Sequence, residues 1–381
     1  MTKQVYINNL SATLPNVAVN NSEMEQRLGK VGGVKSRARA IILRSNGIKQ
    51  RYYAIDPETG EQNFSNAELA ATAVLSLFDD EKELQSIDTL VASSSIPDQI
   101  MPNHASMVHG ELNNPPCEIV STSGVCLCGV TALKYAYLNI KAGESKKSVA
   151  VASELASAMM HARNFEAEHQ HKLDSLSKNP EMAFEKDFLR WMLSDGAGAA
   201  LLTDQPNPEG LSLRLDWIDT FSFANELEAC MYAGAEKVDG KLKGWTTYNS
   251  DDREQQAILS VKQDVRLLNE HVVRITVEET LKRIIAKRQL STDDYDYFLP
   301  HYSSAFFRDK VYQSLVNIDF ELPFEKWFTN LTEKGNTGSA SIFIMLEELF
   351  NTKPLQAGQQ ILCYIPESGR FSSAFMQLTV V

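Results

Sequence analysis

Cys126 is the residue whose type and position most clearly suggest chemistry. It follows a short apolar run over 117–120 and a polar turn over 121–124. After it, apolar residues recur at helical spacing, at Val130, Leu133, Ala136, Tyr137 and Ile140. The unpaired N–H groups and the dipole at a helix N-terminus favour a thiolate, which is the nucleophilic form. We therefore interpret Cys126 as a candidate nucleophile. The alternative is that Cys126 and Cys128 are small residues of the core.

Two further turns carry side chains that could assist a nucleophile. His301 follows the apolar residues 297–299, and Asn336 lies in the glycine-containing turn 335–339. An imidazole near a thiol lowers the pKa of that thiol or exchanges protons with a bound substrate. A side-chain amide can donate a hydrogen bond to a developing oxyanion. These side chains strengthen the interpretation of Cys126 as a nucleophile.

A weak internal repeat indicates how these residues could meet. Each half shows a strand, a polar turn, a helix, a second turn, a second helix and a further strand, with strands expected at 87–92, 148–152, 296–299 and 359–364. Such alternation predicts parallel sheets with helices on both faces, and sites form where the carboxyl ends of the strands meet. We expect two halves, 1–205 and 206–381, divided at the proline-rich segment 205–210.

Composition narrows the class of protein. The chain has 381 residues, of which 43% are hydrophobic, and this length suits two halves better than one core. The net charge of −12 argues against nucleic acid or an anionic membrane as a partner. Its start resembles a strand and no apolar run has the length of a membrane span. Five scattered cysteines indicate a reducing cytoplasm.

Two polar regions invite binding hypotheses. Residues 154–190 are expected to form an excursion that covers a site, and its His169 and His171 lack a third ligand at a suitable spacing, so no metal is expected. Residues 235–255 are interpreted as a second surface excursion. A basic stretch reverses the overall charge, and it could bind an acidic or phosphate-bearing partner or be a solvated face; its members are Lys35, Arg37, Arg44, Lys49 and Arg51.

Along nearly its whole length, the chain resembles the beta-ketoacyl-ACP synthase III family of the thiolase superfamily. The matching segments are Asn46–Arg51, Ser94–Asp98, Ser194–Ala199, Pro300–His301 and Gly335–Ser341. Cys126 lies 7 positions before Leu133 and 17 before Gly143, which fits the nucleophile of the family better than Cys128 does. The order of these segments makes the resemblance more specific than any one of them.

The resemblance implies a thiolase-like α/β fold, in which two pseudo-repeated halves form a five-layered αβαβα arrangement. It implies that Cys126 takes an acyl group from an acyl carrier protein or from acyl-CoA. The backbone N–H of Cys126 and one from the turn around Gly369 would hold the thioester oxyanion. His301 and Asn336 would stabilise the enolate left when a malonyl-carrier thioester loses carbon dioxide, and the enolate would attack the acyl-cysteine. The resemblance also implies a homodimer, and no cofactor.

Departures from the family pattern keep other activities open. The family has a glycine-rich turn where this chain has Pro366–Phe371, with Glu367 and Arg370. No tryptophan lies near residue 41, which favours a carrier protein over CoA as donor. The length of the two excursions suggests a specialised branch such as polyketide biosynthesis. One alternative is an acyltransferase that forms no carbon–carbon bond. Another is a silent subunit of a heterodimeric synthase, although the retained cysteine, histidine and asparagine argue against it.

Overall fold

The computed structural model describes residues 3–36, 38–167 and 188–381. Its main sheet runs in the order β13-β14-β15-β8-β1-β7-β6-β4-β5. The strands of the first half are β1 (Tyr6–Thr13), β4 (Thr89–Ser94), β5 (Glu118–Ser123), β6 (Lys147–Glu154) and β7 (Gly196–Thr203). Those of the second half are β8 (Leu213–Ser222), β13 (Tyr297–Pro300), β14 (Gln360–Glu367) and β15 (Ser372–Val380).

The sheet is mixed rather than parallel throughout. β4 runs parallel to β5 and β6, and β13 runs parallel to β14, as the repeat predicts. β7, β1, β8 and β15 run antiparallel to their neighbours. For β14 and β15 the antiparallel direction follows from their connection. The short hairpin loop 368–371 joins them, and a tight hairpin connects only antiparallel strands.

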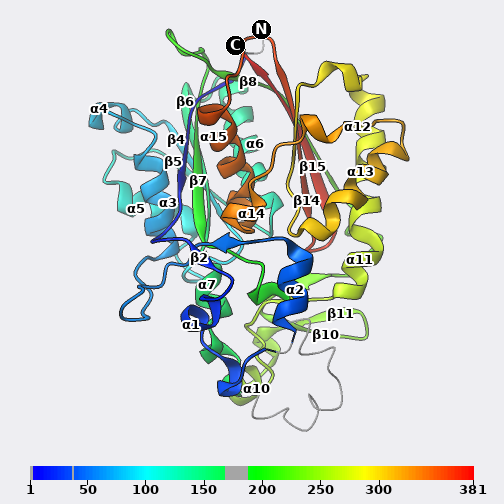
Figure 1. Ribbon diagram of the computed structural model, residues 1–381. Coiled ribbons are helices and arrows are strands. Elements are labelled where there is room, and N and C mark those ends of the chain that lie inside the picture. The colour runs from blue at the N-terminus through cyan, green and yellow to red at the C-terminus, as the bar shows by residue number, and fades with distance from the viewer. Residues whose placement is uncertain (1–2, 37, 168–187) are drawn as a thin grey trace.

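The central helical layer consists of α6 (Leu127–Ala142) and α15 (Ser341–Thr352), which share one core with inward-facing residues of both groups of strands. Alternating side chains of each strand face opposite sides, so Ala150 of β6 joins this core while Val149 packs with the outer helices. On β14, Cys363 faces the central layer and Leu362 faces the opposite side. Figure 1 shows the two central helices between the sheet halves.

The outer layers complete the arrangement. α3 (Asn66–Leu75) and α5 (His104–Leu112) cover β4, β6 and β7. α12 (Thr280–Arg288) and α13 (Arg308–Val316) cover β14 and β15, and α11 (Val265–Val273) continues into α12 through a π-helical segment, Arg274–Glu279. The order helix, sheet, helix, sheet, helix confirms the predicted five-layered fold. The two groups of strands join through a short ladder between β1 and β8, and the division at 205 stays a prediction.

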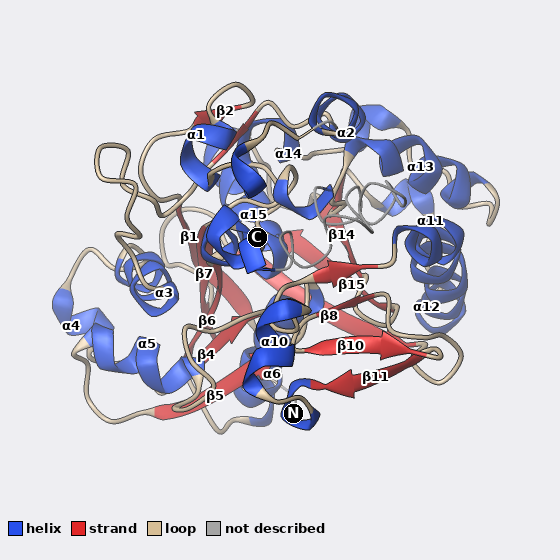
Figure 2. Cartoon of the chain, turned by 90° about the horizontal axis from the view of Figure 1, so that it is seen from below, coloured by secondary structure: helices blue, strands red, loops and turns tan. Residues whose placement is uncertain are grey.

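Most of the shorter elements gather at one end of this frame, away from both chain termini, whereas α14 (Leu331–Lys334) lies nearer the middle and α4 (Glu81–Leu84) nearer the other end (Figure 1). Figure 2 views this end directly and shows the β10–β11 hairpin and α10, which form the excursion expected at 235–255. His169 and His171 lie outside the described residues. The shorter elements are α1 (Met24–Leu28), α2 (Arg39–Asn46), α4 (Glu81–Leu84), α7 (Ala156–Met160), α10 (Ser250–Gln255), α14 (Leu331–Lys334), β2 (Val19–Asn20), β3 (Gln50–Arg51), β9 (Met231–Tyr232), β10 (Ala235–Val238), β11 (Lys241–Gly244) and β12 (Lys262–Gln263).

Candidate active site

Cys126 lies directly before the first turn of α6, as its spacing predicts. The helix ends at Gly143, whose φ of 88° is the left-handed conformation that glycine adopts readily. Cys126 is 8% exposed and lines two cavities, one of about 210 Å³ and one of about 40 Å³. Ser303 and Ser368 also line both cavities. The thiol therefore lies where the two spaces meet.

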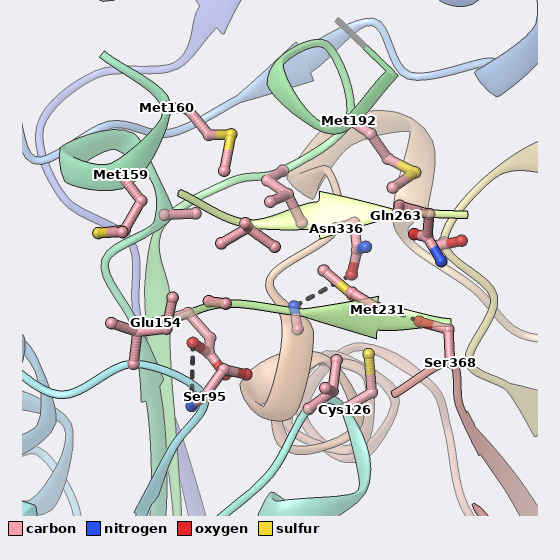
Figure 3. A pocket seen from close by; sticks show the side chains of 18 of the residues that line it. Ser95, Cys126, Glu154, Met159, Met160, Met192, Met231, Gln263, Asn336 and Ser368 are labelled. Carbon is pink, nitrogen blue, oxygen red and sulfur yellow. Dashed lines mark hydrogen bonds between the residues drawn. The ribbon is translucent and has the colours of Figure 1, made fainter. Parts of the chain in front are cut away.

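Asn336 lines the larger cavity, and Figure 3 shows it above Cys126. Its backbone is held by the segment before β7, because its carbonyl accepts from Ser194 N at 2.9 Å and its N–H donates to the Met192 carbonyl at 3.2 Å. The side-chain Oδ1 accepts from Gly338 N at 3.0 Å. With Oδ1 engaged inside the turn, Nδ2 is the amide atom left to donate to a substrate in the cavity.

A glycine allows α6 to approach this turn closely. A Cβ atom on Gly129 would lie 2.3 Å from the carbonyl oxygen of Ser339, a distance that no larger residue could accommodate without displacing backbone. Gly129 is in the first turn of α6, three positions after Cys126. The glycine therefore brings the helix of the nucleophile and the turn of Asn336 into direct contact.

His301 follows β13 and lines the smaller cavity together with Cys126. Its backbone N–H donates to the Tyr364 carbonyl at 2.8 Å, which extends the pairing of β13 with β14. Burial lowers the pKa of the His301 imidazole to about 4. The ring is therefore neutral near pH 7, so it presents one N–H donor and one nitrogen that can accept a proton. The three predicted residues thus converge on two adjoining cavities.

The protonation of Cys126 differs from the expectation at the sequence level. Burial raises the pKa of the Cys126 thiol well above its usual range, and the carboxylates of Glu154 and Glu367 raise it further. The helix N-terminus was expected to favour a thiolate, and that prediction is wrong for the resting state. Desolvation of the charged form is the largest cause of the raised pKa of the Cys126 thiol. A nearby base must therefore take the proton when the sulfur attacks.

The other cysteines do not share this position. Cys128 faces into the core from α6, and burial raises the pKa of its thiol as well. Cys363 is fully buried in β14. Neither lines the two cavities, which agrees with the choice of Cys126 on sequence spacing. Among the described residues, no cluster of histidine, cysteine and acidic side chains is arranged to hold a metal ion.

The turn between β14 and β15 does not place Gly369 as expected. The half-buried Glu367 carboxylate accepts from the Ser372 side chain and from the backbone N–H groups of Arg370 and Gly369. The carbonyl of Gly369 accepts from Cys230 N at 2.8 Å. The N–H of Gly369 is thus engaged within its own turn and its carbonyl is bonded to another segment, whereas Ser368 is the residue of this turn that lines both cavities. The spacing of glycines alone could not reveal this, because the bond to the Glu367 side chain depends on how the turn folds.

The basic stretch divides into surface and interior residues. Lys35, Arg44 and Lys49 are exposed. Arg51 is fully buried, and its guanidinium donates to Asn21 Oδ1 at 2.6 Å and to the Trp191 carbonyl at 3.1 Å. The prediction of a binding role is wrong for Arg51, because its charge is used inside the fold. Arg37 lies outside the described residues.

Sequence analysis missed most of the cavity wall. The larger cavity is lined by four methionines, Met159, Met160, Met192 and Met231, together with the acid Glu154. Met159 and Met160 are neighbours in α7, but Met192 and Met231 come from two other segments, so no local pattern joins all four. Glu154 could have been found, since it ends the buried strand β6 at the sheet edge where Ser94 of β4 also ends.

Comparisons with known proteins agree with the geometry. The family model described as 3-oxoacyl-[acyl-carrier-protein (ACP)] synthase III C terminal matches residues 285–365. The beta-ketoacyl-[acyl-carrier-protein] synthase III of Clostridium perfringens is 24% identical over 326 residues, covering 84% of this chain and 85% of that protein. The enzyme of the same name from Xanthomonas campestris is 23% identical and covers 95% of each chain.

Solved structures show the same fold over the whole chain. A protein described as AbyA1, a tetronic acid condensing enzyme, superposes with a TM-score of 0.74 at 19% identity and covers 98% of this chain and 99% of its own. Xanthomonas campestris OleA with bound lauric acid and lauroyl-CoA superposes with a TM-score of 0.73 at 18% identity and full coverage of both chains. At these identities the structures establish the fold.

Proposed function

Because this chain belongs to the beta-ketoacyl-ACP synthase III-like condensing enzymes of the thiolase superfamily, we propose that it forms beta-ketoacyl thioesters by a decarboxylative Claisen condensation on Cys126. The observation that carries the proposal is the position of Cys126 in the walls of both cavities, beside Asn336 in one and His301 in the other. A nucleophile, a neutral imidazole and an amide donor are the groups that this reaction requires.

The first step is acylation of the enzyme. The Cys126 thiol is protonated at rest, and the neutral His301 imidazole accepts its proton as the sulfur attacks the carbonyl of an acyl thioester. The carbon–sulfur bond to the carrier breaks, and the carrier leaves as a thiol with that proton. Backbone N–H groups hold the oxyanion. We propose the N–H of Cys126 for this role and Ser368 in place of Gly369 for the second donor.

The second step forms the carbon–carbon bond. A malonyl-carrier thioester binds, its carboxylate leaves as carbon dioxide, and the electron pair moves to the thioester oxygen as an enolate. Nδ2 of Asn336 and the N–H of neutral His301 donate to that oxygen. The enolate carbon attacks the acyl-Cys126 carbonyl, the Cys126 thiolate leaves, and it takes up one proton from solvent, which restores the resting thiol. The larger cavity, with its four methionines, holds the acyl chain.

We also propose the partners of the enzyme. We expect two copies of the chain to associate, as the family pattern implies, and β5 is the edge strand of the sheet. An acyl carrier protein is the proposed donor, with Lys35, Arg44 and Lys49 as surface contacts.

All five cysteines are free, which suits a reducing cytoplasm. Among the described residues, no helix is both long and apolar enough to cross a membrane. A polyketide-type pathway remains our expectation for the product.

Intact-protein mass spectrometry tests this proposal. We expect an acyl-carrier thioester to add one acyl mass to the peptide that contains Cys126. Later addition of malonyl-carrier should release carbon dioxide and yield a beta-keto product. Transfer of the acyl group to an alcohol or amine without carbon dioxide would instead support an acyltransferase. Absence of any adduct across short, medium and aromatic acyl carriers would support a silent subunit.

A further inference from the structure

Glu154 is a buried acid that the reaction above does not use. It is the last residue of β6, is 7% exposed and lines the larger cavity near Cys126 (Figure 3). Burial raises the pKa of its carboxyl, while hydrogen bonds from Ser339 and Ser95 lower that pKa. A carboxylate in such a place must be compensated by donors, so its partners indicate its purpose.

The donors to Glu154 come from two different elements. Its Oε1 accepts from Ser339 Oγ at 2.5 Å and from Ser339 N at 3.2 Å. The same oxygen accepts from Ser95 Oγ at 2.6 Å and from Ser95 N at 3.1 Å. Ser95 directly follows β4, and Ser339 lies in the turn that leads to α15. One carboxylate oxygen thus ties the ends of β4 and β6 to the turn that carries Asn336.

The contact with this turn extends beyond the hydrogen bonds. A Cβ atom on Gly338 would lie 3.0 Å from Cγ of Glu154, so the Glu154 side chain packs directly against Gly338. Gly338 has a φ of 55° and donates its N–H to Asn336 Oδ1. On the far side, the Ser339 carbonyl rests against Gly129 of α6. The turn is therefore held between Glu154 and the helix that begins after Cys126.

We propose that Glu154 is a positioning residue for Asn336. Its carboxylate fixes Gly338 and Ser339, Gly338 fixes Oδ1 of Asn336, and Nδ2 is thereby directed into the cavity above Cys126. The inference rests on the proposed function in one respect, namely that Asn336 donates to the enolate oxygen. Oε1 accepts four hydrogen bonds, two from Ser339 in the turn and two from Ser95 after β4, so that oxygen anchors the turn to the end of β4. A shift of about 1 Å in a catalytic group can cost on the order of 100-fold in rate.

The test compares Glu154→Gln, Glu154→Ala and Ser339→Ala with a matched control. Ser157→Ala is the control, because Ser157 Oγ donates to the buried carboxylate of Asp195, and neither Ser157 N nor Ser157 Oγ bonds to the Asn336 turn. The readouts are the rate of self-acylation of Cys126, the rate of carbon dioxide release from malonyl-carrier, and amide hydrogen exchange at residues 336–339.

We expect Glu154→Ala to lower carbon dioxide release by about 30- to 100-fold and self-acylation by less than about threefold, as for loss of an oxyanion donor. Ser339→Ala should lower release by about fivefold, since one of several bonds is lost. Glu154→Gln should recover most of the release, because its amide oxygen can still accept from Ser339. Exchange at 336–339 should rise in Glu154→Ala and stay unchanged in Ser157→Ala.

Three outcomes would overturn the inference. These are equal losses of both rates in Glu154→Ala, an equal loss of release in Ser157→Ala, and unchanged exchange at 336–339 in Glu154→Ala. If Glu154→Ala does not fold, the rates of carbon dioxide release in Ser339→Ala and Glu154→Gln still test whether Glu154 positions Asn336. Hydrogen exchange requires no turnover, so it tests the positioning even if the wild-type protein releases no carbon dioxide, a result that would refute the proposed function alone.

Discussion

The two cavities that meet at Cys126 offer the thiol very different surroundings. The larger has a methionine-lined wall and contains Asn336, whose amide is fixed through a turn. The smaller is bounded by aromatic and aliphatic residues around His301, among them Tyr302, Phe307 and Val272. Methionine side chains are flexible and adapt to a ligand, whereas aromatic walls are stiff and exclude water. The comparison suggests that the larger cavity accommodates different substrates and that proton transfer takes place in the smaller cavity.

Removal of the shared residue should have the largest effect. Cys126→Ala should abolish self-acylation, because both cavities lose the nucleophile. Cys128→Ala is the matched control, since Cys128 is buried nearby on the same helix and lines neither cavity. Peptide mapping after incubation with an acyl carrier would check this. An acyl adduct in the Cys126→Ala protein would contradict the assignment.

Changing His301 should disable both chemical steps. His301→Ala should lower self-acylation and carbon dioxide release by about 100-fold each, since proton acceptance and one enolate donor are lost together. His104→Ala serves as control, because burial also lowers the pKa of His104 to about 4 but that ring bonds to Ser153 away from both cavities. Equal losses in the two variants would mean that His301 acts through stability.

Changing Asn336 should separate the two steps. Asn336→Ala should lower carbon dioxide release by about 100-fold, which is typical for loss of an oxyanion donor, and should leave self-acylation within about threefold. Stopped-flow measurement of carbon dioxide with parallel mass spectrometry would show the split. A loss of both rates to the same degree would remove the proposed distinction between the cavities.

Filling each cavity should change selectivity on one side only. Met160→Phe should lower self-acylation by long acyl chains by about 10-fold more than by acetyl, because contact with a few methylenes is lost. Val272→Phe, in the smaller cavity, should slow all acyl donors alike. Competition between acyl carriers of different length measures both effects. A length preference changed by Val272→Phe instead would place the chain in the smaller cavity.

The smallest expected effect concerns pH. Because burial raises the pKa of the Cys126 thiol above its usual range, less thiolate is present at any pH than for a free cysteine. Alkylation of Cys126 by iodoacetamide should therefore be slower than that of a free thiol at pH 8 and should continue to rise beyond pH 9. A rate that is already constant near pH 7 would indicate a resting thiolate.

Local sequence predicted some features of this site, and others depend on contacts between distant segments. The positions of Cys126, His301 and Asn336 followed from turns at strand and helix ends, which local spacing encodes well. The protonation of Cys126 did not follow, because burial is a property of the whole fold. The buried place of Arg51 was missed for the same reason, since Asn21 and Trp191 are distant in sequence. The internal repeat also did not predict the antiparallel pairing of β15 with β14, or the hydrogen bond from Gly369 N–H to Glu367.

The proposed reaction joins the acyl group on Cys126 to the decarboxylated extender. A single-turnover experiment tests it directly: acyl-enzyme is isolated, freed of donor, and mixed with malonyl-carrier labelled with ¹³C in the free carboxyl group. We predict loss of the acyl mass from the Cys126 peptide, release of labelled carbon dioxide, and a beta-keto product containing the acyl group, all at one rate. Retention of the acyl group on Cys126 while labelled carbon dioxide is released, or its hydrolysis without a beta-keto product, would contradict the account.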